Sequence, residues 1–226
     1  MNGTASAGGF EMIASEFRQK LIDALKTARQ ESKQRKFVQS WDLTINLRDV
    51  DMKKPENRIG EELTLPHDTG KKVATCLIAD VLATKAQGMF DRIIKKDELA
   101  VLDPKTAKKL AEDMDFFFSE ISLMPMVGKV FGSTLAPRNK MPKPIAPNSD
   151  LAAVVERAKK TIKVKAKDAP VINTLIGKEN SKEEDVADNI VFVLDYLDKK
   201  LPKGKDNIRG IILKLTMGKP VKIRVV

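Results

Sequence analysis

Two hydrophobic patterns divide this chain of 226 residues and restrict its fold more than any other feature. Near both ends, apolar and polar residues alternate, as in residues 41–47 (Trp-Asp-Leu-Thr-Ile-Asn-Leu), which is the pattern of a strand with one solvent-facing side. In the middle, apolar runs such as residues 73–79 and 116–118 are short and unbroken, as in buried parallel strands. The contrast predicts two domains, with the central one inserted into a domain built from both ends.

The split domain is expected to be an α+β domain formed by residues 1–69 and 158–226. Its first helix is expected where apolar residues recur at helical spacing, at Phe10, Ile13, Phe17, Leu21 and Leu25. A second helix is expected to begin at a capping box of Ser181 and Glu184 and to end before Pro202. The insertion, residues 70–157, alternates strands with helices, one of them starting at Asp103 and Pro104. We expect a small α/β unit whose sheet is covered on both faces.

An uncharged tip, residues 216–218 (Thr-Met-Gly), lies between two strand-like runs near the C-terminus. Leu213 and Leu215 alternate with Lys214 before the tip, and Val221, Ile223 and Val225 alternate with Lys222 and Arg224 after it. Each run is expected to bury its apolar side and to expose its cations. Glycine permits close approach to another molecule, and the flanking lysines attract phosphate, so nucleic acid is the first expected ligand.

The charge of the chain also favours an anionic partner. With 41 Lys and Arg against 31 Asp and Glu, the net charge is +10, which suits nucleic acid or anionic lipid. Residues 70–157 hold 14 Lys and Arg against 11 Asp and Glu, so the split domain is the more basic part. Aromatic residues make up only 5% of the chain, which argues against a platform that stacks single-stranded bases. Structured RNA is therefore the favoured ligand.

A membrane partner is not expected, because no apolar run approaches the roughly 20 residues needed to cross a bilayer. The first nine residues lack the basic start and apolar centre of a secretory signal and are expected to be a flexible tail, which favours a cytosolic location. The single cysteine, Cys76, is expected to be a small buried residue rather than a reactive thiol.

Catalytic and metal sites are not expected, and neither is a cofactor. His67 is the only histidine and has no cysteine cluster beside it, which argues against zinc and against a catalytic dyad with Cys76. The run that contains Gly128, Lys129, Gly132 and Ser133 matches neither common phosphate-binding glycine motif. No pair of carboxylates stands out as acid and base.

Two basic segments allow two interpretations each. A stiff, exposed, basic loop is predicted by four prolines among three cations: Pro137, Arg138, Lys140, Pro142, Lys143, Pro144 and Pro147. It is either a binding loop or a solvated connection. Phe37 follows Lys33, Arg35 and Lys36, and is either a binding aromatic beside cations or a core residue beside surface charge.

Five motifs make the chain resemble a known family along nearly its whole length from about Phe10. They are Lys36-Phe37-Val38-Gln39-Ser40, residues 51–58 (Asp-Met-Lys-Lys-Pro-Glu-Asn-Arg), Leu65-Pro66-His67, residues 135–144 (Leu-Ala-Pro-Arg-Asn-Lys-Met-Pro-Lys-Pro) and Lys214-Leu215-Thr216-Met217-Gly218. In this order they resemble the archaeal-type L-one family of large-subunit ribosomal proteins, which form the mobile stalk beside the tRNA exit site. The family's usual glycines are replaced here at Asp68, Ala136 and Asn139, and Gly210 stands where a serine is common.

The resemblance implies a split RNA-binding α+β domain, an inserted Rossmann-like α/β domain, and a hinge at Pro66, His67, Gly70 and Ala158. It implies a non-enzymatic constituent of the large ribosomal subunit that binds the stalk region of 23S rRNA and assists release of deacylated tRNA from the exit site. Family analogy adds a translational repressor that binds its own mRNA leader. Such a protein is expected to be cytoplasmic, ribosome-associated and monomeric when free.

The implied RNA contacts lie on the split domain, at Lys36, Phe37, Ser40, Asp42, Lys167, Asp168, Thr216, Met217 and Gly218, and Lys219 is added as the cation beside the tip. Asp42 is expected to accept hydrogen bonds from ribose hydroxyls or base amino groups. Phe37 and Met217 are expected to pack on sugars or bases. Two rivals stay open, a general basic RNA chaperone and a nucleotide-using α/β enzyme built on the central domain.

Overall fold

The computed structural model describes residues 7–167 and 169–224, and of residues 7–15 and Pro104 it describes the backbone alone. The chain forms two compact units: one contains both chain ends, up to Lys71 and from Lys160, and the other is Lys72–Lys159. Both units mix helices with strands, so the expected mixed fold class is confirmed. The Rossmann-like description of the central unit and the predicted boundaries at residues 70 and 157 stay predictions.

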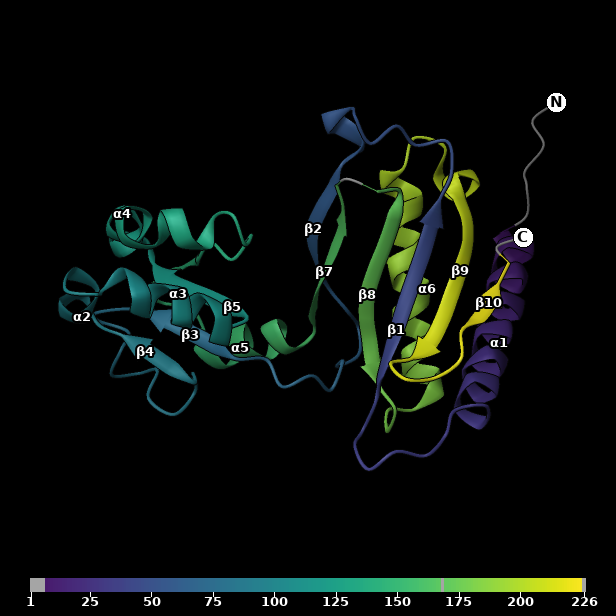
Figure 1. The fold of residues 1–226 in the computed structure, drawn as a ribbon, viewed down its shortest axis with the longest axis horizontal. Coiled ribbons are helices and arrows are strands. Elements are labelled where there is room, and N and C mark those ends of the chain that lie inside the picture. The colour runs from purple at the N-terminus through teal and green to yellow at the C-terminus, as the bar shows by residue number, and fades with distance from the viewer. Residues whose placement is uncertain (1–6, 168, 225–226) are drawn as a thin grey trace. The chain divides into compact units, whose positions relative to one another are not determined.

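The first unit is built on a four-stranded antiparallel sheet with the order β10-β9-β1-β8. The strands are β1 (Ser40–Leu47), β8 (Val171–Lys178), β9 (Ile208–Leu215) and β10 (Val221–Ile223). Helix α6 (Glu183–Lys200) passes behind the sheet, and α1 (Ala7–Gln30) lies beside β9 and β10 (Figure 1). The two helices leave the other face of the sheet open.

Alternation explains why β1 lies at the centre of this sheet. Trp41, Leu43 and Ile45 are fully buried, whereas Asp42 and Thr44 between them are half-buried. Each large apolar side chain contributes about 1.5–3 kcal/mol when it leaves water. A slip of one residue would expose the whole apolar set, so the register is fixed by the core. The strand predicted here is confirmed, and so are the alternating runs on either side of the tip.

Both predicted helices of the first unit are present, but two details were wrong. Helix α1 begins at Ala7, so residues 7–9 are helical rather than a flexible tail. Helix α6 begins at Glu183 with Lys182 as N-cap, and the Ser181 hydroxyl accepts a hydrogen bond from the Lys178 backbone N–H at 3.3 Å instead of capping the helix. The side chains of Phe10 and Ile13 lie outside the described residues, as does Val225.

A separate two-stranded antiparallel sheet completes the first unit, and consists of β2 (Ile59–Thr64) and β7 (Thr161–Ala166). One turn of 3-10 helix, Pro55–Asn57, precedes β2, and another, Gly204–Asn207, precedes β9. Glu61 on β2 accepts hydrogen bonds from the Tyr196 hydroxyl and the Lys200 ammonium of α6. These contacts, the Lys200 hydrogen bond first, hold the pKa of Glu61 below its ordinary value.

The second unit contains a parallel sheet with the order β4-β3-β5-β6. Its elements are β3 (Thr75–Ile78), β4 (Arg92–Ile94), α2 (Lys96–Ala100), α3 (Pro104–Asp113), β5 (Phe116–Glu120), a 3-10 turn (Ile121–Leu123), α4 (Met124–Leu135), β6 (Lys143–Ile145) and α5 (Leu151–Lys159). Helices α2, α3 and α4 pack on one face and α5 on the other, through two separate apolar clusters. The predicted buried parallel strands are confirmed.

The proline-rich segment is only partly the exposed loop that its composition predicts. Pro142 is buried and residues 143–145 form the edge strand β6, where Pro144 is tolerated because an edge strand leaves one side unpaired. The Lys140 ammonium donates to the carbonyl oxygens of Ala111 and Met114 at 2.8 and 2.7 Å, which satisfies the C-terminal end of α3. Asn139 has φ 52°, a conformation that the family's usual glycine adopts freely and asparagine tolerates.

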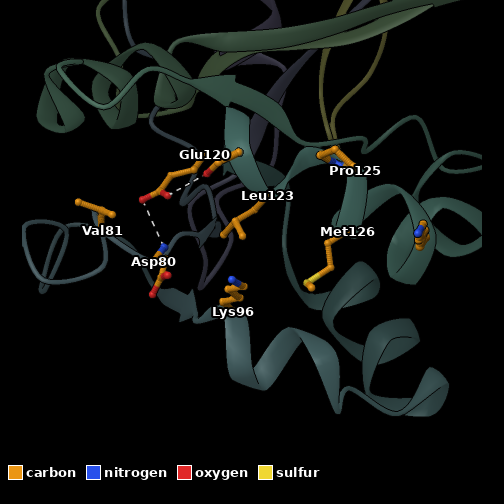
Figure 2. A pocket seen from close by; sticks show the side chains of 9 residues that line it. Asp80, Val81, Lys96, Glu120, Leu123, Pro125 and Met126 are labelled. Carbon is orange, nitrogen blue, oxygen red and sulfur yellow. Dashed lines mark hydrogen bonds between the residues drawn. The ribbon is translucent and has the colours of Figure 1, made fainter.

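A cavity of about 510 Å³ opens at the carboxyl edge of the parallel sheet (Figure 2). Its lining includes Asp80, which follows β3, Lys96 at the start of α2, Glu120 at the end of β5, and Lys129 on α4. Gly128 and Gly132 lie in the interior of α4, so the glycine-containing run is a helix and not a phosphate-binding loop.

Candidate RNA-binding surface

Sheet pairing brings two segments that are 176 residues apart into direct contact. Because β1 and β9 are antiparallel, Trp41 pairs with Leu215, and the start of β1 lies beside the tip that follows β9. The Thr216 N–H donates to the Ser40 carbonyl oxygen at 3.0 Å, and the Ser40 N–H donates to Thr216 Oγ1 at 3.3 Å. Residues 36–42 and 216–219 therefore form one surface, which we call the tip surface.

Gln39 fixes the conformation of the tip surface from beneath. Its side chain is 1% exposed, and its Oε1 accepts a hydrogen bond from the Met217 N–H at 3.1 Å. Its Nε2 donates to Ser32 Oγ at 3.3 Å. Its backbone exchanges hydrogen bonds with Glu179, to the carboxylate at 3.0 Å and from the Glu179 N–H at 2.9 Å. A buried polar group with all these partners rigidifies its surroundings.

Gly218 allows the tip to turn tightly. The Gly218 N–H donates to the Leu215 carbonyl oxygen at 2.8 Å. A Cβ at this position would lie 3.2 Å from the Leu215 Cβ and 3.4 Å from Ser32 Oγ. A larger residue at this position would therefore require the turn to shift by a few tenths of an ångström.

Large apolar side chains are exposed on the tip surface. Met217 is 60% exposed, Phe37 is 55% exposed and Val38 is 52% exposed. The interpretation of Phe37 as a core residue is therefore wrong. The neighbouring Lys36 and Lys219 are exposed as well. Apolar groups and cations side by side suit a ligand that offers both flat faces and phosphates, as structured RNA does.

Asp42 is the residue of the tip surface that lies on the open face of the sheet. It pairs with Lys214 across β1 and β9 and is half-buried. The Lys214 ammonium lies 3.5 Å from the Thr216 carbonyl oxygen, so this lysine also reaches the tip. Further along the same face, Thr44 Oγ1 donates to Asn173 Oδ1 at 2.8 Å. The open face thus offers hydrogen-bonding groups rather than cations alone.

Lys167 does not lie with the other predicted contacts. It follows β7, and the β7–β8 connection meets the far end of β1, where the Leu47 N–H donates to the Pro170 carbonyl oxygen at 2.8 Å. At about 3.3 Å per residue, that end of β1 lies roughly 20 Å from the tip surface. Asp168 lies outside the described residues.

Two residues of the tip surface were not predicted as contacts or supports. Val38 and Gln39 stand inside one of the quoted motifs, but no periodicity or charge pattern sets them apart from a connecting loop. A buried amide that bonds the tip is recognisable only once the strands are paired.

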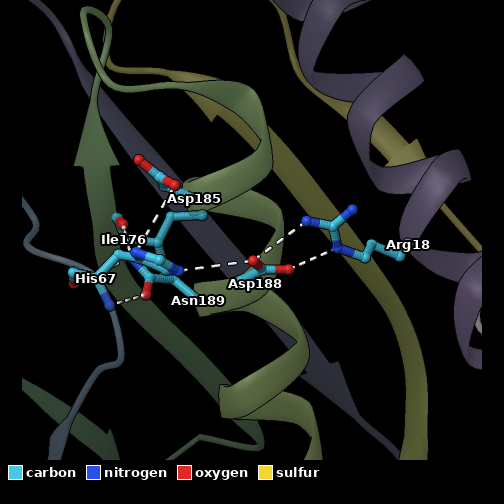
Figure 3. Close-up of polar contacts among 6 residues, drawn as sticks. All are labelled: Arg18, His67, Ile176, Asp185, Asp188 and Asn189. Atoms are coloured by element: carbon cyan, nitrogen blue, oxygen red, sulfur yellow. Dashed lines mark hydrogen bonds and ion pairs between the residues drawn. The ribbon is translucent and has the colours of Figure 1, made fainter.

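The predicted hinge residues lie where the chain leaves the first unit, and His67 is held there by α6 (Figure 3). The His67 N–H donates to Asn189 Oδ1 at 3.1 Å, and the buried Asn189 amide donates to the carbonyl oxygen of Ile176 at 3.0 Å. The two ring nitrogens of His67 lie 3.7 Å from an Asp185 oxygen and 3.6 Å from an Asp188 oxygen. His67 is thus a partnered, half-exposed residue.

Arg18 completes this cluster from α1. Its Nε donates to Asp188 Oδ1 at 2.6 Å and its Nη2 to Asp188 Oδ2 at 3.2 Å. The Arg18 hydrogen bond is the main cause that lowers the pKa of Asp188 below its ordinary value, with a smaller contribution from His67. Gly70 has φ 66° and is followed by the crossing at Lys71, while Ala158 is buried in α5. That these residues act as a hinge stays a prediction.

Cys76 lies buried in β3, as expected, and burial raises the pKa of its thiol to about 12. It is therefore not a thiolate at neutral pH. Within residues 7–167 and 169–224, no three His, Cys, Asp or Glu side chains are grouped so that they could hold a metal ion. Among the helices in the same ranges, none has the length and apolar character required to span a bilayer.

Comparison with known proteins shows to which family this chain belongs. The model of the Ribosomal protein L1p/L10e family matches residues 26–219, which is most of the chain. The chain belongs to this family. The L1-family protein is 42% identical over 210 residues to the large ribosomal subunit protein uL1 of Methanobrevibacter smithii, covering 91% of this chain and 99% of that one. It is 40% identical to the protein of the same name from Pyrococcus abyssi, covering 92% and 96%.

The matches confirm the resemblance drawn from the five motifs. This protein is an archaeal-type L1-family protein of the large ribosomal subunit, where it is a structural constituent. The family is one of ribosomal proteins and not a class of enzymes. Membership implies the large subunit and its rRNA as partners.

Proposed function

We propose that this L1-family protein binds the stalk region of 23S rRNA through the tip surface. The observation that carries the proposal is Met217, whose uncharged side chain leaves the residue 60% exposed and whose backbone N–H is bound by the buried Gln39. Because the backbone of the tip is already fixed, covering the tip with a ligand orders little additional backbone. Burying the Met217 side chain against a sugar or base also excludes water from the neighbouring polar contacts and strengthens them.

The polar and charged groups of the surface have separate roles in this proposal. Lys36 and Lys219 attract phosphates and raise the affinity for any RNA, with a strong dependence on salt. Asp42 repels phosphate, so it favours only an RNA that presents ribose hydroxyls or base amino groups to it. Specificity therefore comes from shape and hydrogen bonding, whereas affinity comes from the lysines. Lys167 belongs to a second contact at the far end of β1, if the bound RNA is long enough to reach it.

Two further roles follow by analogy with the family. The protein assists release of deacylated tRNA from the exit site as part of the mobile stalk, with Pro66, His67, Gly70 and Ala158 as the hinge. It also represses translation by binding its own mRNA leader, because a leader that mimics the rRNA site would compete for the tip surface. The free protein is a monomer, and it works in the cytoplasm on the ribosome.

The proposal is tested by equilibrium titration of the full chain with a stalk-region rRNA fragment and with an unrelated duplex of equal length at physiological salt. We expect a preference for the rRNA fragment of about 1000-fold, which is typical of specific over non-specific nucleic-acid binding. Equal and steeply salt-dependent binding to both RNAs would instead identify a general basic RNA chaperone. The repressor role is tested by competition between the mRNA leader and the rRNA fragment for the protein. We expect the leader to displace the fragment with a similar dissociation constant.

A further inference from the structure

The parallel sheet of the second unit has a topological switch point. The chain passes from β3 to β4 on one side and then to β5 on the other side of β3, which gives the order β4-β3-β5-β6. The connections that leave the carboxyl ends of β3 and β5 therefore run in opposite directions and leave a crevice between them. In open α/β sheets, ligands bind in such a crevice. The cavity of about 510 Å³ lies at this position, and its volume is within the range of small-molecule sites.

The wall of the cavity is held in place by a buried carboxylate. Glu120 is 5% exposed, and its Oε1 accepts hydrogen bonds from the backbone N–H groups of Asp80 at 3.2 Å and Leu82 at 2.7 Å (Figure 2). Its Oε2 accepts a hydrogen bond from the Ser122 hydroxyl at 3.4 Å. The carboxylate thus ties the segment after β3 to the end of β5, and the cavity is formed before any ligand arrives.

Two cations line the cavity. Lys96 begins α2 and Lys129 lies on α4, and both are exposed. Within residues 7–167 and 169–224, neither ammonium group makes a hydrogen bond or an ion pair. By contrast, Lys140 and Lys143 of the same unit are used inside the protein, Lys143 against the ring of Phe116. The two ammonium groups at the cavity are therefore free to attract an anion.

The remaining lining is suited to the rest of a nucleotide. The Asp80 side chain lines the same cavity and is exposed, so its carboxylate is available to accept hydrogen bonds from hydroxyl groups. Val81, Leu123 and Met126 add apolar surface, and Val81 is 74% exposed although it is a large apolar residue. Cations, the exposed Asp80 carboxylate and apolar side chains correspond to phosphate, ribose and base.

We propose that this cavity binds a mononucleotide, with Lys96 and Lys129 as the cations that attract the phosphate, Asp80 as the acceptor for the ribose hydroxyls, and the apolar part of the lining against the base. The site is separate from the RNA surface proposed above, because all its lining residues belong to the second unit. The proposal concerns binding and includes no chemical step.

The test is isothermal titration of the full chain with AMP, with adenosine and inorganic phosphate as separate arms. We expect saturable binding of one AMP per chain, weaker binding of phosphate and no saturation by adenosine. The double variant Lys96→Ala/Lys129→Ala should weaken AMP binding by at least about tenfold, because each lost charge-assisted hydrogen bond has about that effect. Lys85→Ala, an exposed lysine of the same unit outside the cavity, is the matched control and should bind AMP like the parent.

Absence of saturable AMP binding at millimolar concentration would overturn the proposal, and so would AMP binding that the double variant retains in full. Equal affinity for AMP and phosphate would overturn the assignment of a nucleotide. Circular dichroism of the double variant, which changes two exposed side chains, should match that of the parent and serves as the check of folding. Its affinity for the stalk-region rRNA fragment should match that of the parent, so failure of this proposal is distinguishable from failure of the RNA-binding proposal.

Discussion

The backbone N–H of Met217 donates a 3.1 Å hydrogen bond to the side-chain oxygen of Gln39, a residue that is 178 positions earlier in the chain. Gln39 precedes β1 and Met217 follows β9, so this bond joins the two segments that form the tip surface. The acceptor is buried and the donor belongs to an exposed turn, which means that the interior of the unit fixes the backbone that carries the exposed Met217 side chain.

Gln39→Leu should therefore weaken both the fold and RNA binding. The substitution removes the acceptor of the Met217 N–H and the donor to Ser32 Oγ, whereas the backbone hydrogen bonds with Glu179 remain. Leaving a buried donor without its partner costs about 1–3 kcal/mol of unfolding free energy. Urea unfolding measures the stability, and titration with the rRNA fragment measures the affinity. Gln19→Leu, which removes an exposed amide on α1, should change both by less than about 0.5 kcal/mol. Unchanged affinity in a folded Gln39→Leu protein would show that the tip does not need this support.

Met217→Asp places a charge on the tip surface while every cation stays in place. Covering an unpaired carboxylate with RNA is costly, so we expect the specific affinity to fall by a few kcal/mol, on the order of 3 kcal/mol. The affinity for an unrelated duplex should change much less. Val101→Asp makes the same change at an exposed valine of the second unit and serves as the control. Equal binding by Met217→Asp and the parent would exclude the tip from the interface.

Gly218→Ala tests the space inside the turn. The added Cβ would lie 3.2 Å from the Leu215 Cβ, so the turn must shift by a few tenths of an ångström, and the affinity for the rRNA fragment should fall about tenfold. Gly128→Ala is the matched change in the interior of α4, where nothing lies within 4 Å of the new Cβ. That variant should raise the unfolding free energy by about 0.5–1 kcal/mol, because alanine is the better helix former. Titration with the rRNA fragment measures the affinity of both variants, and thermal unfolding measures their stability. Parent-like affinity of Gly218→Ala would contradict the expected effect of the added Cβ.

Lys219→Ala should reduce affinity by a small and salt-dependent amount. Loss of one phosphate contact lowers the slope of log affinity against log salt by about 1, and affects all RNAs alike. The measurement is the rRNA affinity at several salt concentrations. Lys85→Ala, on the second unit, should leave the slope unchanged. A variant with the parent slope would place Lys219 outside the phosphate contacts.

Asp188 gives a pH dependence with a defined sign. Because Arg18 lowers the pKa of Asp188 in the folded state, the ionised carboxylate stabilises the fold. This contribution is complete above the unfolded-state pKa of about 3.9 and is lost as the pH falls through the lower folded-state value. Urea unfolding should therefore show a decline at acid pH that is smaller in Asp188→Asn. Glu16→Gln, an exposed carboxyl on α1, should follow the parent. Identical acid profiles for Asp188→Asn and the parent would contradict this account.

The sequence by itself determined the local structure wherever one side of an element is buried. The alternation from Trp41 to Leu47 predicted β1 and its buried face, because only one register hides the apolar side chains. The spacing of Phe17, Leu21 and Leu25 predicted α1 for the same reason. The five motifs predicted the family, since their order and content are more specific than any periodicity.

The tertiary structure decided which distant segments meet and which polar groups are used inside the protein. Ser181 was expected to cap α6, but its hydroxyl is engaged with Lys178, and Lys140 was expected in an exposed loop, but it bonds the end of α3. Hydrogen bonds of this kind depend on where other elements lie. The same reason applies to the tip surface: the sequence identified Thr216 and Ser40 separately, whereas only the pairing of β1 with β9 placed them together and separated Lys167 from them. The spacing of apolar residues predicts which side chains are buried. Pairing between strands that are distant in the sequence determines which residues those side chains pack against.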